Sequence, residues 1–295
     1  MIRRSGGFRI EPDLEDDWPD LLRGLIKCCP TQWIVWEDAS VLPAEPVAYG
    51  GSAFLKAELL EVWLAEGRPY PTNRLLRGMR DGLVLPLDAE SIRAGNRGKG
   101  LALMVVHFVL AHPSLEHPVT RRFLPSGNAA WYFAHGGYNL ESVWFEVYGK
   151  EAGHFMKAGG YELWSEYQGN DVASRVPEDR RPALYCQRRH HVPLGAMSAS
   201  ALTLFNVLPP SMGLRPSEQR VALHALLGRT DGQIAETLGL SAETVRKAWV
   251  GIFSAAERFV PALFHQVESS SQRGLEKRRH LLEYLRVHME ELRPW

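Results

Sequence analysis

The chain has 295 residues, 45% of them hydrophobic and 23% charged, a composition typical of water-soluble proteins with room for two domains. Lysine plus arginine and aspartate plus glutamate number 34 each, so the formal net charge is zero and a wholly basic protein that coats polyanions is excluded. No apolar run is long enough to cross a membrane, and the amino terminus lacks the apolar core of a signal peptide. We therefore expect a cytoplasmic protein without a membrane partner.

Residues 1–170 mix helical and extended patterns, which predicts an α+β domain with a mixed sheet covered by helices. The first four expected elements are a helix, a strand, a strand that enters a Gly-Gly turn, and a helix: Leu14–Cys28, Trp33–Asp38, Pro46–Leu55 and Ala57–Ala65. Four more follow, alternately helical and extended: Leu101–Ala111, Phe123–Tyr138, Leu140–Met156 and Tyr161–Tyr167.

A basic, glycine-rich loop precedes the apolar segment at Leu101. Its residues Arg97, Gly98, Lys99 and Gly100 fit the R-x-x-G-x-G/A pattern and so resemble the GNAT acyltransferases. That resemblance implies that backbone N–H groups of the loop, at the start of a helix, hold the pyrophosphate of acyl-CoA. An acyl-CoA-dependent N-acyltransferase-like enzyme fused to a helical interaction domain is therefore the alternative interpretation. No catalytic residue is assigned, because no carboxylate or tyrosine can be identified as its acid or base.

The histidines and cysteines do not predict a metal site or a disulfide framework. His107, His112 and His117 are five residues apart, a spacing that does not place them on one helical face, and no cysteine or carboxylate pattern accompanies them. Three cysteines, two of them adjacent at Cys28 and Cys29, indicate reduced thiols. We expect no metal.

A connector is expected over residues 171–213, because much of it is polar and rich in proline and arginine. Within it Met197–Leu208 is apolar enough to pack against a domain, and Pro209 and Pro210 end that stretch. We place the domain boundary there.

Residues 214–295 predict an all-α domain, beginning with two short helices and a third that follows a tight turn. Pro216 suits the first position of the first helix. Thr230 and Gln233 form a capping-box pattern for the second helix, and Gly239 is placed to end it. Ser241 caps the third helix.

The third helix has two distinct faces. Val245, Trp249 and Ile252 are four and three residues apart and should point inward. The opposite side carries Glu243, Lys247, Val250 and Ser254, flanked by Arg246. Lysine and arginine on such a face can reach guanine edges or phosphates in DNA.

These helices resemble the LuxR-type helix-turn-helix over about 40 residues without a gap. The residues that carry the resemblance are Leu214, Pro216, Glu218, Val221, Gly228, Ile234, Ala235, Leu238, Gly239, Leu240, Ser241, Thr244, Val245 and Arg246. The resemblance implies a sequence-specific regulator of transcription that binds double-stranded DNA. The DNA-binding residues expected on this basis are Thr230, Ser241, Thr244, Arg246, Lys247 and Val250.

The chain departs from the LuxR pattern at several positions. Arg215 stands where a threonine or serine cap is usual, His224 takes a usually apolar position, and Val250 replaces a residue that is often basic. The family normally ends with one more short helix, whereas this chain continues through a long carboxyl-terminal segment. The family's mode of dimerisation therefore cannot be transferred.

The carboxyl-terminal segment from Leu275 predicts an amphipathic helix. Its apolar stripe contains Leu281, Leu282, Leu285, Met289 and Leu292. An apolar stripe of this size has to pack against something. We expect a homodimer that this helix forms or supports; the alternative is that the helix folds back and completes the core of its own domain.

The sequence thus predicts a nucleoid-associated transcription regulator with an amino-terminal sensory domain. Its expected partners are double-stranded DNA, a second copy of the chain, a small-molecule effector and RNA polymerase. Besides the acyltransferase, a protein-interaction module that uses the same helix pair, as in sigma-like region-four domains, remains open. No cofactor is expected of the regulator.

Overall fold

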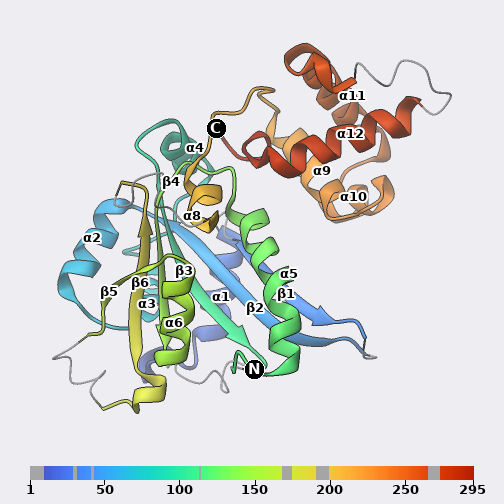
Figure 1. Cartoon of the computed structure of the whole chain (residues 1–295). Coiled ribbons are helices and arrows are strands. Elements are labelled where there is room, and N and C mark those ends of the chain that lie inside the picture. The colour runs from blue at the N-terminus through green and yellow to red at the C-terminus, as the bar shows by residue number, and fades with distance from the viewer. Residues whose placement is uncertain are drawn as a thin grey trace. The chain divides into compact units, whose positions relative to one another are not determined.

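A computed structural model describes residues 10–28, 32–40, 43–112, 114–167, 175–190, 199–264 and 273–295 (Figure 1). The chain divides into two compact units. Unit 1 contains Met1–His135 and Asn139–Asn206, and unit 2 contains Gly136–Tyr138 and Val207–Trp295. Unit 1 therefore includes much of the expected connector, and the chain passes to unit 2 after Asn206, close to the boundary placed at Pro209 and Pro210.

Unit 1 combines a six-stranded mixed sheet with helices, so the expected mixture of helices and strands is confirmed. The strands are β1 (Gln32–Asp38), β2 (Glu45–Leu55), β3 (Leu101–Leu110), β4 (Leu140–Tyr148), β5 (Glu162–Ser165) and β6 (Pro182–Arg188). The helices are α1 (Trp18–Cys28), α2 (Ala57–Glu66), α3 (Pro71–Arg80), α4 (Ala89–Arg97), α5 (Pro118–His135), α6 (Lys150–Ala158) and α8 (Ala199–Phe205).

The described residues of unit 2 form helices, turns and irregular segments, and no strand is present among them. Its helices are α9 (Pro216–Leu226), α10 (Asp231–Leu238), α11 (Ala242–Phe259) and α12 (Arg273–Val287). Short 3-10 turns at Pro261–Phe264 and Met289–Leu292 complete it. The three residues Gly136–Tyr138 belong to this unit because Arg293 Nε donates to the Gly136 carbonyl (2.9 Å) and Trp295 Nε1 donates to the Gly137 carbonyl (3.1 Å).

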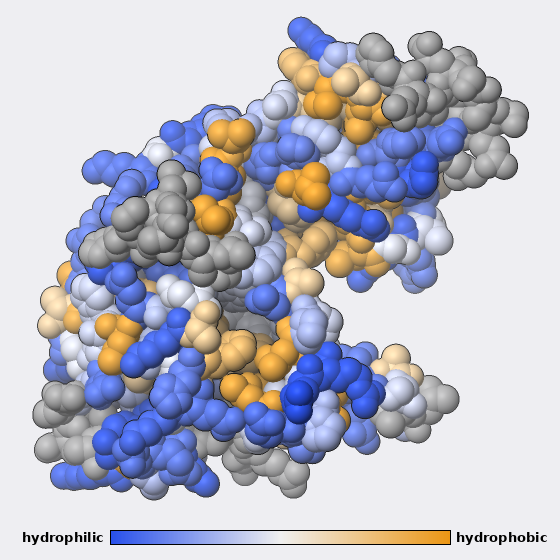
Figure 2. All heavy atoms as spheres, in the orientation of Figure 1, coloured by the Kyte–Doolittle hydropathy of each residue, from blue (hydrophilic) through white to orange (hydrophobic). Residues whose placement is uncertain are grey.

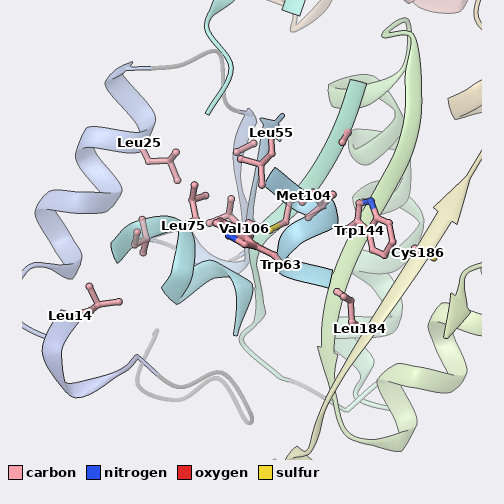
Figure 3. Close-up of a cluster of buried hydrophobic side chains, with 14 of the residues drawn as sticks. Leu14, Leu25, Leu55, Trp63, Leu75, Met104, Val106, Trp144, Leu184 and Cys186 are labelled. Carbon is pink, nitrogen blue, oxygen red and sulfur yellow. The ribbon is translucent and has the colours of Figure 1, made fainter. Parts of the chain in front are cut away.

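The strand order in the sheet is β1-β2-β3-β4-β6-β5. β3 and β4 run parallel, and every other neighbouring pair is antiparallel. One hydrophobic cluster, drawn in part in Figure 3, covers the sheet face that carries Met104 and Trp144, with Leu25 of α1, Trp63 of α2 and Leu75 of α3 packed over it. α5, α6 and α8 pack against the other face (Figure 1).

The predicted helix at Leu101–Ala111 is wrong, because this segment forms the central strand β3. Eight of its ten residues are buried, since helices cover both faces of the sheet. A strand that is buried on both faces has no alternation of polar and apolar residues, and its apolar run cannot be distinguished from a buried helix by periodicity.

Two further elements differ from the prediction. The extended segment predicted at Phe123–Tyr138 lies mostly in α5, whose residues Phe123 and Gly127 are buried one helical turn apart. The helix predicted at Leu140–Met156 is instead β4 followed by α6, with Gly149 (φ 83°) between them. Aromatic residues in β4 and α5 obscured the period in both places, because they suit the core of either element.

Gly50 and Gly51 do not form the predicted turn, since both lie inside β2. The register places Gly51 opposite Trp33 of β1, and a Cβ at Gly51 would overlap the indole ring of Trp33. Here glycine provides room for an aromatic ring on the neighbouring strand.

The predicted connector also contains regular structure. β6 lies between β4 and β5 in the sheet, and Leu204 and Phe205 of α8 are buried in unit 1. Residues 171–174 and 191–198 of the connector lie outside the described residues. Polar residues around β6 suggested a loop, but β6 pairs antiparallel with both β4 and β5 and so completes the sheet.

Among the described residues, no helix has the length and apolar character required to cross a bilayer. On the face drawn in Figure 2, hydrophilic residues cover most of the surface and apolar residues gather in separate small patches.

Parallel pairing of β3 with β4 stops at Val105 and Phe145, although both strands continue. The amino-terminal end of α3 satisfies polar groups beyond this point: the Thr72 hydroxyl donates to the Val106 carbonyl, and the Tyr70 backbone N–H donates to Glu146 Oε1 (2.8 Å). The Tyr148 hydroxyl donates to Glu146 Oε2 (2.8 Å). Glu146 is therefore a buried carboxyl group held at the position where two strands separate.

Burial raises the pKa of Glu146 to about 7, against hydrogen bonds from the Tyr70 backbone N–H and the Tyr148 hydroxyl that favour the ionised form. The folded state then binds a proton between about pH 4.5 and pH 7 that the unfolded state releases. This contribution stabilises the fold below that window and is lost as the pH rises through about 7.

We predict that Glu146→Gln removes this part of the pH dependence. Between pH 5 and pH 8 the free energy of unfolding of the parent chain should fall by up to about 3 kcal/mol more than that of the variant. Urea unfolding of both full-length proteins at the two pH values measures the difference, because all other titrating groups are shared. Parallel pH profiles would contradict the assignment.

Candidate nucleic-acid interface

α10 and α11 are consecutive helices whose amino-terminal ends are capped by side chains. Thr230 Oγ1 accepts from the Gln233 backbone N–H (3.4 Å), and Gln233 Oε1 accepts from the Thr230 backbone N–H (2.9 Å). Ser241 Oγ accepts from the Thr244 backbone N–H (3.1 Å) and lies 2.8 Å from the Thr244 hydroxyl. The predicted capping box and serine cap are therefore both present.

The turn between the helices is set by Gly239, which has φ 63°. The Leu240 backbone N–H donates to the Ala235 carbonyl (2.8 Å), which closes the end of α10. Only Gly239, Leu240 and Ser241 separate the two helices. Such a short turn holds the start of α11 in a defined direction relative to α10.

The inward face of α11 is as predicted. Val245, Trp249 and Ile252 are buried, together with Ala248 and Ala256. On α10, Ile234 and Ala235 are buried as well. These apolar contacts leave the opposite side of α11 exposed.

The exposed side of α11 carries the residues expected to meet DNA. Thr244, Arg246, Lys247 and Val250 are all exposed, and Val250 has 57% of its surface accessible. Thr230 and Ser241 are also exposed, but their hydroxyl groups are already engaged in capping. Helix capping alone therefore explains why Thr230 and Ser241 stand at these positions. Arg246 and Lys247 have no capping role.

Glu243 neutralises much of the positive charge on this face. Arg246 donates from Nε and Nη2 to the two oxygens of Glu243 (2.8 and 2.7 Å), and Lys247 Nζ lies 3.8 Å from Glu243 Oε1. The hydrogen bond and the charge of Arg246 hold the pKa of Glu243 below its ordinary value. The spacing of three residues between Glu243 and Arg246 could have indicated this pair from the sequence.

The start of α9 is anchored to α11 through a buried carboxylate. Glu218 Oε2 accepts from the Arg215 backbone N–H (2.8 Å), and Oε1 accepts from Arg215 Nε (2.9 Å). Glu218 is only 4% exposed, and a Cβ at Gly251 of α11 would overlap its Oε1 atom. Arg215 is not an ordinary cap, but its guanidinium holds the Glu218 carboxylate in the position where it accepts from the Arg215 backbone N–H.

α12 is attached to the helix pair by an aromatic and ionic contact. Arg278 donates to both oxygens of Asp231 (2.8 and 3.2 Å), and its guanidinium lies 4.1 Å from the ring of Trp249. The Trp249 Nε1–H donates to Asp231 Oδ1 (3.1 Å). Although burial opposes it, hydrogen bonding to Arg278 and Trp249 lowers the pKa of Asp231. Sequence spacing gave no signal for this contact, because Asp231 and Arg278 are far apart in the chain.

The apolar stripe of the carboxyl-terminal segment is used within unit 2. Leu281 and Leu285 are fully buried, and Met289 and Leu292 are 8% and 5% exposed. α12 contacts α9 and the 3-10 turns on either side of it. α12 therefore packs within its own unit, as in the alternative in which this helix folds back, and Leu282 is the stripe residue that is only partly buried.

The loop Arg97–Gly100 has a different surrounding from the one its pattern predicted. It follows the carboxyl-terminal end of α4 and enters the strand β3 instead of a helix. The backbone N–H groups of Gly98 and Gly100 both donate to the Gly95 carbonyl (3.1 Å each). The end of a helix disfavours an anion, because its carbonyl groups carry partial negative charge.

The glycine at position 100 has a structural reason. Its φ is 118°, and a Cβ there would lie 3.0 Å from Glu141 Cβ and 3.1 Å from the Asn139 carbonyl oxygen. Asn139 in turn donates through Nδ2 to the Asn96 and Gly98 carbonyls (2.8 and 3.2 Å). The loop is thereby fastened to the beginning of β4.

No protein-family model and no curated protein sequence matches this chain.

We predict that the effect of Gly251→Ala on the stability of the fold reverses in sign when Glu218 is replaced. In the parent chain the new methyl group displaces Glu218, and the lost hydrogen bonds to a charged group should outweigh the gain in helix propensity, giving a net destabilisation of about 1 kcal/mol. In a Glu218→Ala background the same substitution should stabilise by roughly 0.5–1 kcal/mol.

Thermal unfolding followed by helical circular dichroism measures both effects. Gly232→Ala is the matched control, because Gly232 is also helical but a Cβ there meets no atom within 4 Å. The same sign in both backgrounds would show that the contact of Glu218 with Gly251 does not matter.

Proposed function

We propose that the chain is a sequence-specific DNA-binding regulator of transcription, in which the exposed face of α11 enters the major groove and unit 1 responds to a small-molecule effector. The observation that carries this proposal is the exposed group Arg246, Lys247 and Val250 on a helix whose other face is buried. A helix presented in this way, after a short turn from a preceding helix, is the geometry of groove recognition.

Each exposed residue has a distinct role in the proposal. Arg246 offers a planar fork that can bind guanine O6 and N7, and Lys247 suits a phosphate oxygen. Val250 offers an apolar surface for a thymine methyl group. Thr230, Ser241 and Thr244 hold the two helix starts in place, near which backbone N–H groups can meet phosphates.

The low charge of this surface shapes how binding would work. Residues 214–295 contain 12 lysines and arginines and 10 aspartates and glutamates. Because Glu243 already occupies the fork of Arg246, DNA has to replace an internal partner, which weakens non-specific attraction to phosphate. A homodimer that attaches at two half-sites would restore affinity, and its contact surface is one other than the apolar stripe of α12.

As a regulator of transcription, the chain would also have RNA polymerase as a partner. We do not extend the proposal to acyl-CoA, because the N–H groups of Gly98 and Gly100 are bound within their own helix end. The proposed location is the cytoplasm, at the nucleoid.

We predict opposite effects for two neighbouring substitutions. Arg246→Ala should weaken binding to the selected sequence by roughly 1–3 kcal/mol, the value of one bidentate base contact. Glu243→Gln should raise affinity for unrelated duplexes and steepen the salt dependence by about one ion, because it frees cationic charge for phosphate.

The experiment selects bound duplexes from a random-sequence library with the full-length chain and then measures affinity at several salt concentrations. Arg258→Ala is the control on the same helix, because its guanidinium lies over the ring of Phe259 near the far end. Failure to enrich any sequence, or unchanged affinity and salt dependence in an Arg246→Ala, Lys247→Ala double variant, would overturn the proposal.

A further inference from the structure

A recess in unit 1 is bounded by α2, α3 and the strand β5. Its walls include Trp63, Trp144, Trp164 and Tyr167, and Arg68 and Arg74 stand at it as cations. None of these residues belongs to the helices proposed to bind DNA. The recess therefore needs its own explanation.

The walls are aromatic and already hold cations against ring faces. Trp144 and Trp164 meet edge to face with ring centres 5.2 Å apart. The guanidinium of Arg74 lies 4.9 Å from the ring centre of Trp63, and that of Arg188 lies 4.8 Å from the ring centre of Trp164. Such walls favour a flat, apolar ring, which can stack or meet an aromatic edge.

The charge at the recess is unbalanced toward the positive side. Arg74 Nη2 lies 2.9 Å from Glu66 Oε2, and Arg68 Nε lies 3.9 Å from the same oxygen. Two guanidinium groups thus share one carboxylate, and the side chain of Arg68 is 71% exposed. A ligand with one carboxylate would complete this set of charges.

The backbone is strained at the same place. Among the described residues, Tyr70 and Tyr167 are the non-glycine residues with positive φ, at 63° and 53°. Tyr167 lines the recess, and Tyr70 precedes Pro71, which also lines it. Such conformations are unfavourable for residues other than glycine and persist where the surroundings enforce them, often at ligand sites.

The enforcing contact is the buried Glu146 carboxyl group behind the recess. Its Oε1 atom binds the Tyr70 backbone N–H, and its Oε2 atom binds the Tyr148 hydroxyl. This network fixes the base of the recess. The recess as it stands has room for about one water molecule, so binding of a ring requires Trp164, which is 42% exposed, to turn outward.

We propose that this recess binds a planar aromatic compound with a single carboxylate, whose ring lies between Trp63 and Trp164 and whose carboxylate meets Arg68 and Arg74. That the compound acts as an effector rests on the function proposed above. The binding itself does not depend on that function.

Isothermal titration calorimetry of the full-length chain tests the binding with three probes: indole-3-acetate, benzoate and 2-naphthoate. At least one should bind saturably. Its uncharged parent, which is indole, benzene or naphthalene, should bind at least tenfold more weakly, and tryptamine should not bind. Absence of saturable binding by all three acids, or equal binding by the uncharged parents, would overturn the proposal.

Two variants separate the charge from the ring contact. Arg68→Gln and Trp164→Leu should each weaken the best acid at least fivefold, and both are expected to fold because Arg68 is 71% exposed and Trp164 lies partly exposed on the edge strand β5. Arg121→Gln is the control, since Arg121 is 68% exposed and lies on α5. Equal affinity in all variants would refute this site.

Selection of DNA by the same preparations, with and without the acid, distinguishes this inference from the proposed function. Acid binding without DNA selection would leave the recess a ligand site and remove its role as a sensor. DNA selection without acid binding would refute the proposed ligand site and leave the proposed DNA-binding function standing.

Discussion

Unit 1 depends on the place where β3 and β4 cease to pair. Two parallel strands that continue without each other leave backbone carbonyl and N–H groups that need new partners in the interior. The start of α3 supplies one of them, since the Thr72 hydroxyl donates to the Val106 carbonyl, and beside it the Tyr70 backbone N–H donates to the Glu146 side chain. The left-handed backbone of Tyr70, the burial of Glu146 and the aromatic recess beside them all follow from this separation.

Unit 2 is organised around a different requirement, the rigid presentation of one helix. α11 is capped at its start and buried along one side, Glu218 of α9 packs closely against its Gly251, and Arg278 of α12 lies over its Trp249. The cations beside these contacts, Arg215 and Arg278, are paired with the acids Glu218 and Asp231 of the same unit. The ion pairs that hold the helices in place therefore leave fewer cations free at the surface. An anionic partner of this unit has to be recognised mainly by shape and by replacing a small number of internal ion pairs.

The sequence predicted local features well where they depend on neighbouring residues. Caps at Thr230 and Ser241 and the turn at Gly239 were foreseen because each acts within four residues. The buried stripe of α11 was foreseen from its period. By contrast, β3 was misread as a helix because its burial on both faces removed the period, and β6 was hidden in a segment of loop-like composition.

Long-range contacts could not be predicted from one sequence. Nothing near Asp231 points to Arg278, and nothing near Gly251 points to Glu218, because neither pair shares a local pattern. The aromatic recess is of the same kind, since Trp63 of α2 and Trp164 of β5 both line it although they are far apart in the chain. The glycine pattern at Gly100 resembled a phosphate-binding loop, but close packing against Glu141 and Asn139 already explains the glycine at this position.

The short segment Gly136–Tyr138 has a practical consequence for dissecting the chain. It is assigned to unit 2 but is joined at both ends to α5 and β4 of unit 1, so the polypeptide passes between the units three times. A single cut after Asn206 would release a fragment that still carries Gly136 and Gly137 without Arg293 and Trp295, to which their carbonyl groups are bonded. No one-site truncation yields both units whole, and separate expression of either calls for a redesigned link across Gly136–Tyr138.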